Sequence, residues 1–182
     1  FDKVEGEVPS FTERKNQIIS IGAINPETMN RKGHKRFIEL ARLLPEYQFI
    51  LGGKYAPECK DYIDGLGIKN LKLTGFLSNS ELKNLFCESK YYVQLSEHEA
   101  FGCSVVEAGL NGCNLIISDK AALPEVVGEF ASVFTPEKTQ EIADFIKINL
   151  EQAPKASSEI SSGLKSKFPY DNRESELLNV FK

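Results

Sequence analysis

The sequence has no tryptophan, one methionine and two histidines, and no apolar run approaches the roughly 20 residues that span a bilayer. No charged segment followed by an apolar run opens it, so no secretory leader is expected. It also lacks the P-loop, G-x-G-x-x-G, G-x-S-x-G and C-x-x-C patterns. These absences argue against ATP hydrolysis, the usual NAD-binding fingerprint and hydrolase chemistry. Because His34 and His98 fall in different loops, no metal site is predicted either.

The net charge and the cysteine content further narrow the class of protein to which this sequence can belong. Lys and Arg number 22 against 26 Asp and Glu, a net charge of -4, which argues against nucleic-acid binding. The composition, 41% hydrophobic and 26% charged, suits one globular domain with its own core. Cysteines 59, 87, 103 and 113 are widely spaced, so we expect free thiols and a cytoplasmic location. The first residue is Phe1, and we expect the chain to be processed, trimmed or cut from a larger protein.

Short apolar runs alternate with stretches of helical spacing along most of the chain. The runs are Ile18–Gly22, Phe49–Gly53, Leu71–Gly75, Tyr91–Leu95, Leu115–Ser118 and Ser132–Phe134. Buried strands alternating with helices predict an α/β fold, a Rossmann-like doubly wound parallel sheet of about six strands. Ligands of such sheets bind beyond the carboxyl ends of the strands.

The helical stretches lie around residues 37–44, 82–86, 105–110 (closed by Gly112) and 139–150. Ser80 is the predicted N-cap of the second, with Lys83 at N3 and therefore no full capping box. Pro124 is expected at the first position of a further helix, followed by Glu125.

After Pro154 the pattern changes to two helical stretches without a strand, Lys155–Phe168 and Asp171–Phe181. We divide the chain into a lead-in or linker (1–16), the Rossmann-like domain (17–154) and a C-terminal helical tail (155–182). The tail packs either on this sheet or on a neighbouring domain.

The segment S-E-H-E-A-F-G-C-S-V-V-E-A-G carries two glutamates eight positions apart, Glu99 and Glu107. Between them Phe101 and Gly102 form a strand-to-helix turn, where glycine admits close approach of a ligand. Backbone N–H groups at the start of the helix favour anions and hydrogen-bond acceptors. Two carboxylates here can bind sugar or ribose hydroxyls; alternatively, Glu99 is solvated and Glu107 only complements the helix dipole.

A basic segment follows the first strand and opens a helix. It contains Arg31, Lys32, His34, Lys35 and Arg36 around a glycine. Cations at a helix start oppose its dipole by about 0.3–1 kcal/mol each, and a bound phosphate reverses that sign. The alternative is a solvated basic turn.

Two other strand ends are weaker candidates. Gly75, Phe76 and Leu77 offer an apolar surface and backbone groups to a flat base, or they simply fill a turn. Cys103, near a helix start, has no evident base partner and is expected to be structural.

The string from Ser96 to Gly128, S-E-H-E-A-F-G-C-S-V-V-E-A-G-L-N-G-C-N-L-I-I-S-D-K-A-A-L-P-E-V-V-G, resembles a known family. It is similar to the Glu-x7-Glu region of nucleotide-sugar-dependent retaining glycosyltransferases of the GT-B architecture (glycosyl transferases group 1, family 4-like). The resemblance covers residues 17 to 182. It implies that the chain is one half of a GT-B fold, the carboxy-terminal half that holds the sugar donor.

The resemblance also implies roles for residues at matching positions. Glu99 and Lys32 would be catalytic, Glu99 contacting the donor sugar's hydroxyls and Lys32 neutralising the diphosphate. Glu107 would bind the ribose, and the base would lie against Gly75–Leu77. The remaining donor-binding candidates are Gly22, Arg31, Phe101, Gly102, Cys103 and Ser104.

Three departures from the family pattern stand out. Ala23 stands where a second diphosphate-binding arginine is usual, and Arg31 or Arg36 are the candidates to replace it. Ala100 replaces a usual glycine, and Cys103-Ser104 replaces a usual Leu-Pro pair. Loss of a cation that stabilises a leaving diphosphate lowers a rate by orders of magnitude in comparable electrostatic cases.

The implied reaction is sugar transfer from a nucleotide diphosphate sugar to an acceptor hydroxyl, with anomeric retention and no obligatory metal or other cofactor. The acceptor, a glycan or lipid, would be bound by a missing amino-terminal domain, which could also bring peripheral membrane association. The isolated chain is expected to turn over little. The alternatives are a non-catalytic or degenerate nucleotide-sugar-binding module and a GT-B-like sugar-nucleotide epimerase. The sequence names neither the nucleotide, the sugar, the acceptor nor the oligomeric state.

Overall fold

The apolar runs form a six-stranded sheet in the computed structural model, which describes residues 7–149 and 151–169. The strands are β1 (Lys15–Ile21), β2 (Gln48–Gly52), β3 (Leu71–Leu73), β4 (Ser89–Gln94), β5 (Asn114–Ser118) and β6 (Ala131–Phe134). They pair in the order β3-β2-β1-β4-β5-β6, and every pair is parallel. The prediction of a doubly wound parallel sheet is confirmed.

Alternate side chains of each central strand enter two separate cores. Ile18 and Tyr91 belong to one buried cluster, whereas their neighbours Ile19 and Tyr92 belong to the other. This follows from the two-residue period of a strand, which sends successive side chains to opposite faces. The continuous apolar runs in the sequence therefore reflect burial on both faces.

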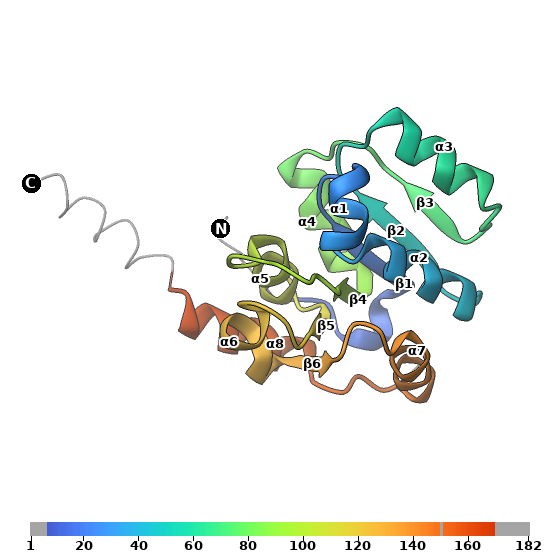
Figure 1. The fold of residues 1–182 in the computed structure, drawn as a ribbon. Coiled ribbons are helices and arrows are strands. Elements are labelled where there is room, and N and C mark those ends of the chain that lie inside the picture. The colour runs from blue at the N-terminus through green and yellow to red at the C-terminus, as the bar shows by residue number, and fades with distance from the viewer. Residues whose placement is uncertain (1–6, 150, 170–182) are drawn as a thin grey trace, which may run out of the picture.

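Helices cover both faces of the sheet (Figure 1). One core receives side chains from α1 (Pro26–Arg31), α2 (His34–Leu43), α3 (Pro57–Gly65) and α7 (Thr139–Ile148). The other receives them from α4 (Asn79–Glu88), α5 (Cys103–Leu110), α6 (Leu123–Val127) and α8 (Ser157–Lys167). Two short 3-10 turns, Phe11–Glu13 and Gly128–Phe130, complete the described elements.

The strand order places β1 beside β4 at the centre of the sheet. The chain leaves β1 toward β2 on one side and returns to β4 on the other, so the connections diverge at this pair. A crevice opens at such a switch point, beyond the carboxyl ends of the two strands. The loops after β1 and β4 are therefore neighbours in space.

Several local predictions need correction. The N-cap of α4 is Ser78, not Ser80, because Ser78 and Glu81 form a full capping box: Ser78 N donates to Glu81 at 2.8 Å, and Glu81 N donates back at 3.4 Å. Helix α6 begins one residue earlier than expected, so Pro124 is its second residue. Helix α3 is absent from the predicted elements, since its apolar positions Cys59 and Ile63 are few.

The segment predicted as a lead-in overlaps the domain. Strand β1 starts at Lys15, and the preceding Arg14 is 4% exposed. Its guanidinium donates to the carbonyls of Phe86, Ser89 and Asn111 at 2.8–3.1 Å, which ties the start of the described chain to the sheet.

At the other end, α8 packs against α5 through Ile160 and Leu164. The described part of the tail thus lies on this domain, one of the two predicted placements. The second predicted tail helix, Asp171–Phe181, lies outside the described residues.

All four cysteines are free, as expected from their spacing. Within residues 7–149 and 151–169, no helix has both the length and the apolar character to cross a membrane.

Candidate functional site

Lys32 and Glu99 meet across the switch point. Lys32 follows β1 and Glu99 follows β4, and the Lys32 ammonium donates to the Glu99 carboxylate at 2.5 Å. Their side chains are 22% and 14% exposed. The two residues to which the family resemblance gives catalytic roles are thus brought together by sheet topology, although 67 positions separate them.

Local sequence explains how Lys32 reaches this position. Asn25 caps α1, accepting from the Thr28 N–H at 2.9 Å, while Thr28 accepts from the Asn25 N–H. Helix α1 ends at Arg31, and Gly33 then adopts φ 75°, a left-handed conformation that suits glycine. The basic segment, predicted to open one helix, thus contains the end of α1 and the start of α2, with Lys32 at the break between them.

His34 holds the loop that follows β1 through a hydrogen bond to its backbone. It is fully buried, and its Nε2 lies 3.0 Å from the Ala23 carbonyl. Burial, with the nearby Lys32 charge, lowers the pKa of His34, although the hydrogen bond to Ala23 opposes that shift. A buried neutral imidazole fits the donation of its Nε2 proton to that carbonyl.

The loop after β4 is fixed to the first loop by backbone contacts. The Glu97 N–H donates to the Arg31 carbonyl at 2.9 Å. Gly102 caps α5 with φ 89°, and a Cβ there would lie 2.7 Å from Leu123 and 3.6 Å from Glu99. Glycine therefore allows the helix start to pack beside Glu99, and the predicted strand-to-helix turn is present at this position.

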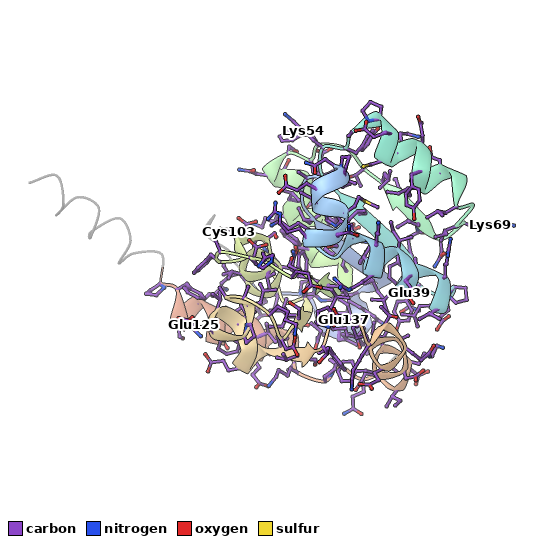
Figure 2. All side chains as sticks on the ribbon, viewed as in Figure 1. Glu39, Lys54, Lys69, Cys103, Glu125 and Glu137 are labelled. Atoms are coloured by element: carbon purple, nitrogen blue, oxygen red, sulfur yellow. The ribbon has the colours of Figure 1, made fainter. Side chains whose placement is uncertain are left out.

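The first N–H groups of α5 face the same crevice edge. The N–H groups of the first helical residues have no carbonyl partner within the helix, and here they belong to Cys103 and Ser104. Such groups and the helix dipole attract anions and hydrogen-bond acceptors. Figure 2 labels Cys103, whose side chain is exposed.

The other residues on this segment have distinct surroundings. Glu107 is half-buried on the second turn of α5. Phe101 packs edge-on against Phe168 at the end of α8, with ring centroids 5.7 Å apart. The Ser104 hydroxyl lies 2.8 Å from the Tyr92 hydroxyl, which turns this side chain toward the core.

The candidate base-binding segment lies at the ends of β2 and β3. Gly75 has φ 76° and accepts from the Gly53 N–H at 2.9 Å. Phe76 is 73% exposed, and the Lys54 ammonium lies 5.5 Å from its ring centroid. Figure 2 labels Lys54 on the loop after β2. The arrangement presents an exposed aromatic face with a cation beside it.

Gly22 links these parts of the site. Its N–H donates to the Gly52 carbonyl at 2.9 Å, and a Cβ on Gly53 would lie 2.0 Å from the Gly22 oxygen. The loops after β1 and β2 therefore approach each other backbone to backbone.

The two arginines considered as replacements at position 23 are both paired with carboxylates. Arg31 Nε lies 3.2 Å from Glu27. Arg36 pairs with Glu97 and with Glu137, the latter at 2.9 Å. Lys32 is thus the basic side chain of this segment that contacts Glu99.

Sequence reasoning missed one part of the site. A set of buried polar side chains, Tyr92, Gln94 and Ser96, lies directly beneath the crevice. The available signal was the presence of Tyr92 and Gln94 in a strand predicted to be buried on both faces. Among the described residues, no cluster of three or more His, Cys, Asp or Glu side chains could hold a metal ion.

Comparisons with known proteins bear on the family and on the fold of this chain. A sequence profile described as "Glycosyl transferases group 1" matches residues 4–165. The serotype-specific mannosyltransferase WbdA of Escherichia coli is 33% identical over 136 residues, which are 69% of this chain and 16% of that protein. The chain therefore spans only a small part of such relatives.

Solved structures share the fold. The crystal structure of Anabaena Alr3699/HepE in complex with UDP and glucose superposes with TM-score 0.75, at 21% identity, over 92% of this chain and 48% of that one. The C-terminal domain of the glycosyl transferase group 1 family protein LpcC from Francisella tularensis superposes with TM-score 0.64, at 20% identity. That likeness covers 85% of this chain and 87% of the LpcC domain.

Proposed function

Since the chain belongs to the glycosyl transferases group 1 family, we propose that it is the donor-binding half of a glycosyltransferase. In this proposal it binds a nucleotide diphosphate sugar at the carboxyl ends of β1 and β4. The sugar then passes to an acceptor hydroxyl.

The Lys32–Glu99 contact across the switch point is the observation that carries this proposal. A nucleotide diphosphate sugar has anionic phosphates next to hydroxyl donors. The phosphates attract the Lys32 ammonium, and the sugar hydroxyls donate to the Glu99 carboxylate, so one ligand replaces both halves of the ion pair. The N–H groups that begin α5 add hydrogen bonds to the same phosphates.

The remaining contacts extend along the crevice. Glu107 accepts from the ribose hydroxyls, and the base lies against Gly75–Leu77, next to the exposed face of Phe76. Bound UDP and glucose in the HepE structure, which has the same fold, support a nucleotide-sugar ligand for this type of domain.

In the proposed reaction, the bond from the anomeric carbon to the diphosphate breaks and a bond to the acceptor oxygen forms. The nucleoside diphosphate leaves with the negative charge that Lys32 faces, and the acceptor proton passes to the released diphosphate or to solvent. We propose that the anomeric configuration is retained and that no metal is required. The acceptor, a glycan or lipid, is bound by a part of the protein beyond this chain.

One observation favours a second candidate, a binding module with little or no transfer activity. Ala23 supplies no second cation, and Arg31 and Arg36 are engaged by Glu27, Glu97 and Glu137. Glu99→Ala in the full-length protein separates the two candidates. An enzyme transfers sugar and loses this activity in Glu99→Ala, whereas a binding module binds the donor but transfers no sugar with either residue at position 99.

The donor-binding proposal is tested by calorimetric titration of the chain with UDP, GDP and ADP, and then with their sugar conjugates. We expect saturable binding of one nucleotide. Lys32→Ala should weaken it about tenfold or more, because a hydrogen bond to a charged group contributes roughly 1.5–3 kcal/mol. Glu107→Ala should weaken it as well.

Lys35→Ala is the matched control, since Lys35 is an exposed lysine three residues away on α2. It should leave the affinity unchanged. Equal loss in both lysine variants, or no binding of any nucleotide at millimolar concentration, contradicts the proposal.

A further inference from the structure

Beneath the crevice, buried polar side chains form a connected chain of hydrogen bonds. The Tyr92 hydroxyl lies 2.9 Å from Gln94 Oε1 and 2.8 Å from Ser104 Oγ. Gln94 Nε2 donates to Ser96 Oγ at 2.5 Å, and Ser96 Oγ donates to the Lys32 carbonyl at 3.4 Å. The exposures of Tyr92, Gln94 and Ser96 are 0%, 1% and 0%.

In this series of hydrogen bonds, each donor group faces an acceptor group. The Tyr92 hydroxyl has one proton, which goes to Gln94 Oε1, because an amide oxygen can only accept. Its lone pairs then accept from the Ser104 hydroxyl and from the Ile21 N–H, which lies 3.4 Å away. Burial, together with the Glu99 and Glu107 charges, raises the pKa of Tyr92, so the phenol stays protonated.

This series of hydrogen bonds connects several parts of the candidate site. Tyr92 joins the end of β1, through Ile21, to β4 and to the first turn of α5. Through Gln94 and Ser96 it also reaches the backbone of Lys32. Burial of these polar groups carries a desolvation cost that an apolar core would avoid. When every group has a hydrogen-bond partner, however, the network holds its side chains in one arrangement.

We propose that Tyr92 is a positioning residue of the donor site, whose hydroxyl fixes the first turn of α5 relative to the Lys32 loop. This proposal rests on the proposed function for its ligand. It explains why serine occupies position 104: its side chain belongs to the network, while its backbone N–H stays available at the helix start.

The adjacent tyrosine provides a matched control. Tyr91 is equally buried, but it faces the opposite core, where its hydroxyl donates to the Asn149 carbonyl at 3.1 Å. Tyr91→Phe and Tyr92→Phe therefore remove the same atom from the same strand, on opposite faces of the sheet.

The experiment compares both variants with the parent chain by amide hydrogen exchange and by titration with UDP and GDP. In Tyr92→Phe we expect the amides of Val105 and Val106, which donate to the Gly102 carbonyl, to exchange about three- to tenfold faster, as loss of one hydrogen bond to this turn predicts. Nucleotide affinity should fall by a similar factor. Tyr91→Phe should change neither, although it can lower global stability.

Ser104→Ala removes the same hydrogen bond from the helix side and keeps the proposal testable if Tyr92→Phe does not fold. The double variant should lose no more affinity than Tyr92→Phe alone, because Ser104→Ala deletes an interaction that Tyr92→Phe already removes. Unchanged exchange at Val105 and Val106, or equal effects of Tyr91→Phe and Tyr92→Phe, overturns the inference. If the parent chain binds none of UDP, GDP and ADP, the proposed function fails, and the exchange result alone still decides the role of Tyr92.

Discussion

At Gly33 the backbone adopts φ 75°, and a Cβ there would lie 2.2 Å from the carbonyl oxygen of Leu95. This single residue lets the helix break after Lys32 rest directly on the end of β4. The position of the candidate catalytic lysine therefore depends on the absence of one side chain.

Gly33→Ala should destabilise the chain strongly, by more than the roughly 1–2 kcal/mol that a left-handed alanine costs alone. The excess comes from the clash with the Leu95 backbone. Chemical unfolding measures it. Gly67→Ala is the control, because Gly67 has φ 63° and a Cβ there would meet nothing within 4 Å. Equal losses in both variants would contradict a close approach at Gly33.

His34 gives a second residue-scale prediction. Burial lowers its pKa in the folded state, so the unfolded chain binds more protons as pH falls below about 6.5. Stability should therefore decrease on acidification from pH 7.5 to 5.5, by at most about 1.4 kcal/mol for each pH unit.

Urea unfolding at several pH values checks the prediction, with His34→Gln expected to flatten the profile. The acidic groups with lowered pKa values, Glu13, Glu81 and Asp119, titrate below this window. A profile that is unchanged in His34→Gln would show that another group carries the pH dependence.

Among the helices and strands, α5 contributes several parts of the candidate site. Its cap, Gly102, packs beside Glu99; its first turn supplies N–H groups and Ser104; its second turn carries Glu107. Its inner side packs on α8, where Leu164 would lie 2.3 Å from a Cβ on Gly109. A tightly packed helix holds its N-terminus in a fixed place relative to the sheet.

Cys103 makes this helix start accessible to a chemical probe. It is exposed, whereas Cys59 and Cys113 are buried and Cys87 is partly buried. Iodoacetamide should therefore modify Cys103 first, and a bound nucleotide sugar should slow the reaction. Mass spectrometry with and without donor measures the rate, and Cys103→Ser is the control. Equal rates at saturating donor would contradict a ligand at the start of α5.

The sequence predicted elements unevenly, for identifiable reasons. Strands were found because burial on both faces produces continuous apolar runs. Helix α3 was missed because its buried positions are few, and Ser80 was chosen as a cap although Ser78 has the Glu81 partner. Ser78 and Ser80 lie two residues apart, and both are suitable N-cap residues, so the sequence alone does not show which of them caps the helix.

For the molecule as a whole, the described residues form one Rossmann-like domain. The candidate site lies at the carboxyl ends of its central strands, β1 and β4. It spans 48% of the HepE chain but 87% of the LpcC C-terminal domain. Those proportions support our proposal that this chain is one half of a larger glycosyltransferase.

We therefore expect the chain alone to bind donor but to transfer little or no sugar. The full-length protein should transfer it with the anomeric configuration retained, which NMR of the product establishes. EDTA should leave both donor binding and transfer unchanged, since Lys32 and the start of α5 supply the positive potential. Efficient transfer by the chain alone, or loss of activity in EDTA, would contradict these expectations.

The α/β class, the parallel sheet and the segments that carry Lys32, Glu99 and Glu107 follow from local periodicity and from a family string, both of which can be read from the sequence. Which side chains meet depends on the folded structure. It joined Lys32 to Glu99, paired Arg36 with Glu97, and turned Ser104 toward Tyr92. Such contacts depend on strand order and on close backbone approach at glycines, and neither property is encoded within a short window of residues.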